Sequence, residues 1–493
     1  MSIEVAIATN RFGLGAIPGQ LGSQLGGQFA GQTGGITGDP KTWLLRQTVR
    51  PELALIAQPG LPNSAQAFRN FLDYAQIRRD ARRVARSPAP PDMTNMADMN
   101  PIETAPNDVA RAAAFGARSI GMEMDARITH ALTTPAPFLE RWTLFWSNAL
   151  TMAAKNLQTV QFPGPYEREA IRPHVLGKFS DLLKSSVLHL GMLVYLDQIR
   201  SFGPTSPAAA LSARRPQGRS LGLNENLARE ILELHTLGAD GGYTQNDVTQ
   251  FAYALTGWTV HGLRNARPTG GQELGSVIFV PALHEPGTRT IMGQDFGANG
   301  ANQARDILDW LARQPQTARR IAKAVATHFV SDTPPASLTD RLAQVFMRTE
   351  GDLQALAQAL INSPEAWQPE AQKFKTPYEF LLSTLRASGT KEVSAAALRD
   401  TFQQLGQPPW RAPSPKGWPD TTDKWASPDA ILKRVDWSNL AAEVISETMS
   451  PTAFAQAALG ESLTPATRLA VSRAQDARQG IVLILMSPEF QRR

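Results

Sequence analysis

Apolar residues recur at spacings of three and four along most of this chain, and this periodicity restricts its fold more than any other feature. It is clear in Ala304–Leu311 and again in Ile321–Phe329. Such spacing places the apolar side chains on one face of an α-helix. Alternating, strand-like runs are few, and Ser276–Val280 is the best of them. The sequence therefore predicts a mainly α, multi-helical protein of one or two packed helical subdomains, with a short β-hairpin or extended piece near 274–294.

The length of the chain predicts how it is organised. Its 493 residues exceed the roughly 250–300 residues that one hydrophobic core supports, so we expect more than one packed unit. We divide the chain into an N-terminal helical region at 1–86 with a Gly/Gln-rich segment at 19–38, a Pro/Met-rich linker at 87–101, a central helical core at 102–370, and a C-terminal helical region at 371–493 with a Pro/Trp-rich loop at 406–428. The three tryptophans of that loop predict that it packs against the protein.

Residue counts exclude several kinds of chemistry. Without any Cys, the chain has no disulfide, no thiolate metal ligand and no cysteine nucleophile. The net charge of +5 is small for this length and does not indicate nucleic-acid binding. The arginine-rich run Ile77–Arg86 is more typical of a solvated helix face, because no aromatic side chain is interleaved for base stacking. We find no membrane span and no secretory signal, so the sequence as written predicts a cytoplasmic protein.

The densest group of chemically active residues lies at 224–258, where we expect a helix, a tight turn and a second helix. Asn224 is placed to cap the first helix, and Gly238 to end it in a left-handed conformation. The expected buried stripe of this helix is Leu227, Ile231 and Leu234. Thr244–Asp247 has the form of a capping box that opens the second helix. The carboxylates and the imidazole of this segment suit a divalent cation or general acid–base chemistry. They equally suit a salt-bridged helix pair, and the residues alone favour that structural interpretation.

Other histidines and motifs point to packing. His130, His189 and His328 fall within apolar helical runs, which is typical of packed core histidines. Trp142, Phe145 and Trp146 have helical spacing and are expected in the core. The sequence has no P-loop, no Gly-x-Ser-x-Gly and no His-Glu-x-x-His.

These motifs resemble a bacterial family known as domain of unknown function 1800 (DUF1800). The likeness rests on residues 224–238 (NENLAREILELHTLG), 243–258 with its Leu–Thr–Gly–Trp end, and 166–197. Shorter matches are Arg11–Gly13, His284–Gly293, Lys375–Arg386, Gly417–Pro419 and Ser487–Phe490. The resemblance covers nearly the whole chain and implies an uncharacterised helical protein.

Three departures from the family pattern matter for function. Ser147 and Ala149 stand where family members typically carry the two histidines of Trp-His-Asn-His. Gln198 replaces the Asn that follows Tyr–Leu–Asp, and Glu285 replaces the Asp of a His–Asp pair. If the missing histidines bind metal in relatives, this chain is a degenerate or structural member. Many relatives look exported and are encoded beside a second family, numbered 1501, that resembles alkaline-phosphatase-like enzymes, which implies a candidate protein partner.

Two functions remain open from the sequence. The lost histidines and the missing nucleophile motifs favour a scaffold, assembly or partner protein with a degenerate site. The alternative is an enzyme or ligand-binding protein whose acidic and histidine pocket holds a divalent cation and acts on a polar or phosphorylated substrate. We expect the helix that starts at Asn224 to face the segment ending at Asp197, with His284–Glu285 close by. The candidate polar site is Asp197, Asn224, Glu225, Asn226, Arg229, Glu230, Glu233, His235, Asp247, His284 and Glu285.

Overall fold

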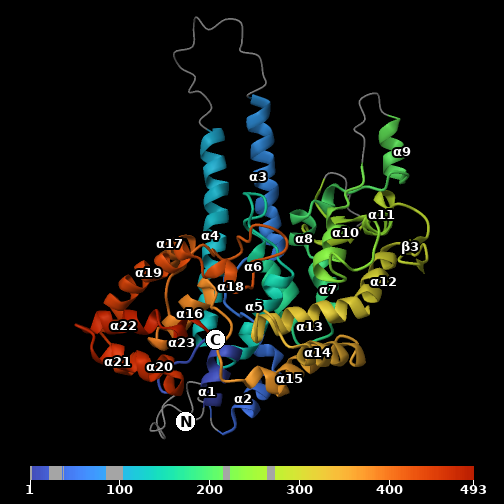
Figure 1. The fold of residues 1–493 in the computed structure, drawn as a ribbon. Helices are drawn as coiled ribbons and strands as arrows, with labels where there is room; N and C mark the ends of the chain where they lie inside the picture. Colours follow the sequence, from blue (N-terminus) through green and yellow to red (C-terminus); the bar gives the residue numbers. More distant parts are fainter. Residues whose placement is uncertain (1–2, 21–35, 37, 85–103, 215–221, 264–271) are drawn as a thin grey trace, which may run out of the picture.

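The computed structural model of this chain describes residues 3–20, 36, 38–84, 104–214, 222–263 and 272–493 (Figure 1). Helix makes up 61% of the structure, so the predicted mainly α fold is confirmed. Most of the Gly/Gln-rich segment 19–38 and the whole linker 87–101 lie outside the described residues.

Helices follow one another along the described chain with short connections. The first half contains α1 (Ile3–Ile7), α2 (Pro40–Gln47), α3 (Ser64–Val84), α4 (Thr104–Thr133), α5 (Pro137–Ala149), α6 (Pro163–Tyr166), α7 (Phe179–Val187), α8 (Leu190–Tyr195), α9 (Pro207–Ala213), α10 (Asn226–Glu230) and α11 (Gln245–Leu255). The second half contains α12 (Ala301–Ala312), α13 (Pro315–Phe329), α14 (Ala336–Arg348), α15 (Leu353–Asn362), α16 (Pro377–Ala387), α17 (Ala395–Gln404), α18 (Thr422–Trp425), α19 (Pro428–Ser446), α20 (Pro451–Ala458), α21 (Pro465–Ser472), α22 (Ala477–Leu485) and α23 (Pro488–Gln491).

Short strands form two separate antiparallel pairs. The strands are β1 (Trp258–Val260), β2 (Val277–Phe279), β3 (Arg289–Ile291) and β4 (Gln294–Phe296). Trp258 lies opposite Phe279 in the first pair, and Arg289 opposite Phe296 in the second. The strand expected at Ser276–Val280 is therefore present, and a second hairpin follows it.

Two clusters of buried apolar side chains form the interior. The larger includes Trp142 and Phe329 and draws on the described segments from α1 to α15. The smaller includes Phe380, Trp437 and Phe490, and joins α16 to α23 with the C-terminal half of α4. Figure 1 shows these C-terminal helices gathered on one side of α5 and α13, and α7 to α12 on the other. The boundary between the two clusters therefore runs past α5, α13 and the start of α16.

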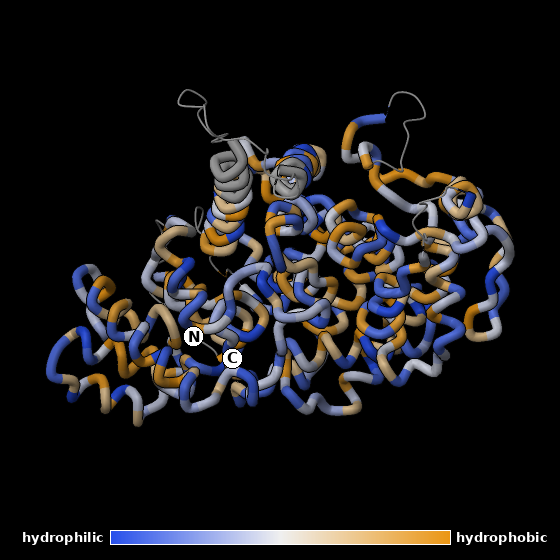
Figure 2. The backbone as a smooth tube through the Cα atoms, turned by 90° about the horizontal axis from the view of Figure 1, so that it is seen from above, coloured by the Kyte–Doolittle hydropathy of each residue, from blue (hydrophilic) through white to orange (hydrophobic). Residues whose placement is uncertain are grey.

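The helices α3 and α4 stand side by side and project from the body (Figures 1 and 2). Hydrophobic and hydrophilic residues alternate around the helices in Figure 2. No helix within the described ranges combines the length and the apolar character that a membrane span requires.

A π-helical turn at Ile231–His235 continues α10 and changes which side chains are buried. Because such a turn adds a residue to the repeat, the positions beyond it rotate about the helix axis. Leu234, which the regular spacing places in the buried stripe, is therefore only half-buried, and Leu232 and His235 are buried instead. That part of the predicted stripe is wrong.

Candidate functional site

The segments nominated by the sequence do lie together. Ser201, just after Asp197, is hydrogen-bonded to the backbone of Asn224, whose N–H donates to its hydroxyl at 3.1 Å. The N–H of Gly203 donates to the carbonyl of Leu283 at 2.9 Å. The segment after Asp197 thus contacts both the start of the Asn224 helix and the short 3-10 turn Pro281–Leu283 that precedes His284.

The polar side chains at the start of this helix are engaged within the chain. Glu225 accepts hydrogen bonds from Thr249 at 2.6 Å and from Gln245 at 2.8 Å, and Arg229 lies 3.3 Å away. These contacts fasten α10 to α11. Asn224 accepts from the backbone N–H of Asn226, whose own side chain is exposed. The helix itself begins one residue after Glu225, so Asn224 caps from further out than the sequence predicts.

Four other residues of the nominated set, Asp247, Glu285, His284 and Asp197, make hydrogen bonds or ion pairs with neighbouring turns and loops. Asp247 completes the predicted capping box with Thr244 and also accepts from the N–H of Met292 at 2.7 Å. Glu285 accepts from both the N–H and the hydroxyl of Thr205, at 2.8 and 2.7 Å. His284 Nδ1 lies 2.9 Å from the carbonyl oxygen of Thr256. Asp197 lies beside Arg200 at the surface, 3.1 Å from it.

His235 and Glu230 occupy environments that disfavour charge. Burial, with a smaller contribution from Arg320, lowers the pKa of His235 to about 3, so its imidazole is neutral. Burial and the neighbouring Glu233 raise the pKa of the half-buried Glu230. In the described part of the chain, no three His, Asp or Glu side chains converge closely enough to hold a metal ion. A functional role for this set stays a prediction.

A different group of polar residues surrounds a cavity of about 100 Å³, called here the chamber, at the boundary between the two apolar clusters. The polar side chains that line it are Arg127, Arg141, Ser147, Asn148, Thr151, His328, Thr376, Tyr378, Glu379, Gln407 and Asp420. They come from α4, α5, α13 and α16 and from the loop before α18. The chamber has room for a few water molecules or a small polar group.

His328 and Asp420 form the pair most suited to chemistry in the chamber. His328 Nδ1 lies 2.7 Å from Asp420 Oδ2. Since the carboxylate can only accept, the proton sits on Nδ1 and leaves a lone pair on Nε2. Among the described residues, Nε2 has no hydrogen-bond partner, although it is buried. Burial lowers the pKa of His328 despite the opposing carboxylate of Asp420, so the imidazole is neutral at pH 7.

A second group that contains Ser, His and an acid does not have this arrangement. His189 Nδ1 accepts the N–H of Gly191, so the proton sits on Nε2. His189 Nε2 lies 2.9 Å from Ser64 Oγ and 3.2 Å from Glu169 Oε2. The imidazole therefore offers no free lone pair, and the cluster joins the start of α3 to α8.

Charged and hydroxyl groups face the chamber from α4 and α16. The guanidinium of Arg127 lies 5.1 Å from the ring centroid of Tyr378 and 5.0 Å from that of Trp410. The Tyr378 hydroxyl is buried without a partner in the described ranges, and burial raises its pKa to about 12. Tyr378 thus stays protonated and can donate a hydrogen bond. Arg141 is paired with Glu379 at 2.5 Å.

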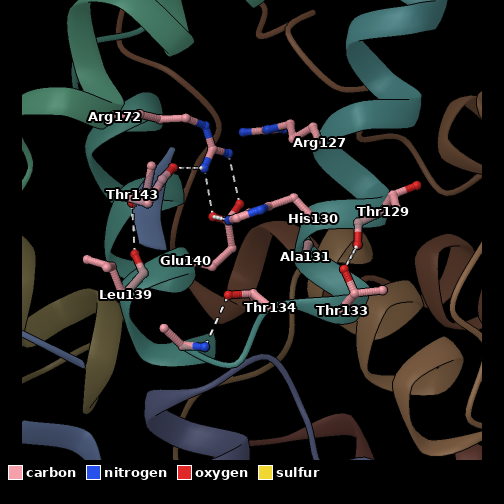
Figure 3. A network of polar contacts seen from close by, with 12 residues as sticks. Arg127, Thr129, His130, Ala131, Thr133, Thr134, Leu139, Glu140, Thr143 and Arg172 are labelled. Atoms are coloured by element: carbon pink, nitrogen blue, oxygen red, sulfur yellow. Dashed lines mark hydrogen bonds and ion pairs between the residues drawn. The ribbon is translucent and has the colours of Figure 1, made fainter. Parts of the chain in front are cut away.

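Buried ion pairs fix the helices that carry these groups (Figure 3). Glu140 of α5 accepts from both terminal nitrogens of Arg172 at 2.8 and 2.9 Å, and His130 of α4 lies 3.2 Å away. Arg172 also pairs with Glu167, which pairs with Arg127 at 3.0 Å. Burial alone would raise the pKa of Glu140, but Arg172 and His130 outweigh it and hold the pKa well below its ordinary value. These contacts lock α4 and α5 together beneath the chamber.

The Pro/Trp-rich loop closes the chamber from the other side. Trp425 is buried and its indole N–H donates to the carbonyl of Pro419, which agrees with the prediction that the loop packs down. Asp420 is held in this loop by the buried amine of Lys373, which donates to its carbonyl oxygen. The loop therefore places Asp420 against His328.

A larger groove of about 920 Å³ adjoins the chamber. The two share Phe145, Asn148, Trp418, Pro419 and Asp420 as lining residues. The groove continues along α13 and past the turn at Leu237–Asp240. The chamber is therefore adjacent to a solvent-facing approach.

A family model described as "Protein of unknown function (DUF1800)" matches residues 7–492. The chain belongs to the DUF1800 family. Neither a curated protein nor a solved structure matches it.

Two positions at which the family resemblance leads us to expect histidines lie at this site. Ser147 lines the chamber, and its hydroxyl donates to Glu167 at 2.8 Å; Ala149 lines the groove. The matched segments Lys375–Arg386 and Gly417–Pro419 also contribute to the walls. In this DUF1800 chain, three of the family segments, at 146–149, 375–386 and 417–419, thus meet at the chamber and the groove.

Sequence reasoning missed His328 and Asp420 for identifiable reasons. His328 lies in an apolar helical run, where a histidine is more often packed than functional. Asp420 lies in a loop 92 residues away, and no periodicity links the two. The available signal was Gly417–Pro419, a family segment that ends directly before Asp420.

Proposed function

We propose that this DUF1800 chain is a ligand-binding protein whose chamber holds a small polar group and accepts a proton at His328 Nε2. The observation that carries the proposal is that Nε2 of the neutral His328 is buried and has no hydrogen-bond partner within the described ranges, while Asp420 fixes its other ring nitrogen. An imidazole poised in this way is the usual general base at neutral pH. Arg127, Arg141 and Tyr378 supply donors for the ligand's oxygen atoms.

This proposal corresponds to the alternative of a ligand-binding protein or enzyme that the sequence leaves open. It places the site in the chamber around His328 and not in the Asn224 segment. The sequence favours the scaffold interpretation because two family histidines and the common nucleophile motifs are missing. The chamber offers polar groups that do not depend on those motifs. A metal ion is not part of the proposal, and a protein partner remains an expectation from the family resemblance.

Thermal-shift screening of small polar metabolites tests the proposal. A ligand that binds only the folded protein raises the melting temperature by an amount that grows with the logarithm of its concentration relative to its Kd. We expect at least one compound to stabilise the protein and to lose its effect in His328→Gln. The matched control is His261→Gln, because His261 lies outside the chamber lining and its ring nitrogen Nδ1 lies 3.0 Å from the nearby carbonyl oxygen of Glu273. Hits that survive in His328→Gln, or the absence of any hit, would overturn the proposal.

A further inference from the structure

The groove beside the chamber carries an excess of positive charge. Its basic lining residues are Arg319, Arg320, Lys323 and Lys416, against the acids Asp240 and Asp420. Asp420 is already engaged by His328 and Lys373. The groove therefore has more cationic groups than it has carboxylates to neutralise them.

Three of these cations are free to meet a ligand. Arg319, Lys323 and Lys416 have exposed side chains, and none makes an ion pair with a residue in the described ranges. Arg320 differs, because its guanidinium donates to the carbonyl of Leu234 and so closes the C-terminal end of the neighbouring helix. Unpaired cations around a concave surface concentrate anions there.

The helix α13 carries two of the groove's cations and also His328, the proton acceptor of the chamber. Arg319 and Lys323 are four residues apart on α13 and so lie on one face, which lines the groove. His328 follows five residues after Lys323, about 140° further around the helix, and lines the chamber from another face. With a rise of about 1.5 Å per residue, Lys323 and Arg319 lie about 7 and 14 Å from His328 along the helix axis. Because the groove and the chamber share Asn148, Trp418 and Asp420 in their linings, an elongated molecule that reaches from the cations to His328 passes these residues.

We infer that the groove binds the anionic end of an elongated small molecule, a phosphate or pyrophosphate group, while its polar end enters the chamber. The inference rests on the proposed function for the end of the ligand that meets His328. It adds the substrate class, since three cations around one groove suit a multiply charged anion better than a single carboxylate. Gln316, Thr327 and Ser414 line the same groove and offer neutral donors.

Calorimetric titration of the full chain with pyrophosphate at fixed ionic strength tests the groove. We expect saturable one-site binding that Lys323→Glu weakens by about tenfold, because attraction becomes repulsion. Lys416→Glu, in the loop at 406–428 that also lines the groove, should act in the same direction, and it keeps the test valid should one variant fold poorly. Lys391→Glu is the matched control: Lys391 is exposed and lies outside the groove, and its replacement changes the net charge equally. The affinity of the Lys391→Glu variant for pyrophosphate should stay within about twofold of that of the unaltered protein.

The outcomes separate the groove from the chamber. Equal weakening by Lys391→Glu and Lys323→Glu would reveal general charge attraction and overturn the groove as a site. No saturable pyrophosphate binding, in a protein that still shows the His328-dependent thermal shift, would overturn the inference and leave the proposed function standing. Pyrophosphate binding that depends on Lys323 and Lys416 supports the groove even where the chamber fails its own test.

Discussion

Asn148 holds the backbone of Trp418 from 270 residues away along the chain, through both ends of its carboxamide. Its Oδ1 accepts the N–H of Trp418 at 2.8 Å, and its Nδ2 donates to the carbonyl of Trp418 at 2.9 Å. Gly417 next to it has φ +84°, and a Cβ there would lie 2.4 Å from the carbonyl oxygen of Asn148. Only glycine allows the loop to approach α5 so closely.

Asn148→Ala should therefore loosen the loop that closes the chamber. Removal of both hydrogen bonds leaves two backbone groups without partners, which costs about 1–3 kcal/mol of unfolding free energy. Urea denaturation measures this loss, and limited proteolysis should cut faster within residues 406–428. Asn439→Ala is the control, because the Asn439 amide donates to the carbonyl of Val435, one turn back on its own helix, and so holds no distant segment of the described chain. Equal losses in both variants would contradict this role of Asn148.

Glu140→Gln should be among the most destabilising single substitutions in the chain. It removes the charge that compensates the fully buried Arg172, and breaking a buried pair in this way costs about 3–5 kcal/mol. Chemical denaturation at pH 7 measures the change. Glu365→Gln at the more exposed pair with Arg341 should cost less than about 1 kcal/mol. Similar costs at the two sites would show that Arg172 finds other partners.

Acid should act through the same carboxylates. Arg172 and His130 hold the pKa of Glu140 below its ordinary value of 4.5, and Arg127 and Arg172 do so for Glu167 against the opposing effect of burial. A depressed pKa means that the stabilisation is complete above pH 4.5 and is lost as the pH falls towards the folded-state value. The free energy of unfolding should therefore drop below pH 4.5, with a shallower slope in Glu140→Gln.

The fold could be predicted because its signals are local. Helical spacing, the Thr244 capping box and the glycine at position 238 each act within a few residues, and all three features are present. The π-helical turn at Ile231–His235 was missed because no residue in it breaks the regular pattern. One additional residue per turn was enough to exchange Leu234 for His235 in the interior.

The site could not be predicted in the same way, because its partners are distant. Arg141 and Glu379 are 238 residues apart, and the sequence identifies Glu379 only as an acid near the start of a helix, where it suits the helix dipole. The sequence nominates the acid-rich Asn224 segment as a candidate site because its charged residues are close together along the chain. In the folded protein Glu225 links α10 to α11 through its hydrogen bond with Thr249. The charged side chains around the chamber come instead from α4, α5, α16 and the loop before α18.

His235→Leu should make the stability of the protein less sensitive to pH. Burial lowers the pKa of His235 to about 3. Below pH 6.5 this imidazole therefore takes up a proton in the unfolded chain but stays neutral in the folded protein. Stability is therefore lost as the pH falls, by about 2 kcal/mol between pH 7 and pH 5 from this residue. Both ring nitrogens lack partners among the described residues, so leucine should be tolerated at pH 7. Denaturation curves at the two pH values measure the difference, and an unchanged pH dependence would contradict the assignment.

Nitrogen NMR of the histidine side chains should identify the protonation state of His328. Because Asp420 accepts from Nδ1, the spectrum at pH 7 should show a protonated Nδ1 and an unprotonated Nε2 for the signal that His328→Gln removes. The signal should titrate below pH 6.5, since burial lowers the pKa of His328.

Asp420→Asn then separates the effect of the carboxylate from that of burial. The Asp420 carboxylate raises the pKa of His328 against the larger effect of burial, so its removal should lower that pKa further. It should also release the ring from a single tautomer, because an amide can donate as well as accept. Asp423→Asn is the matched control, three residues along the chain and exposed. A His328 titration that shifts upward in Asp420→Asn, or shifts equally in both variants, would show that Asp420 does not set the proton on Nδ1 and would remove the basis for a general base in the chamber.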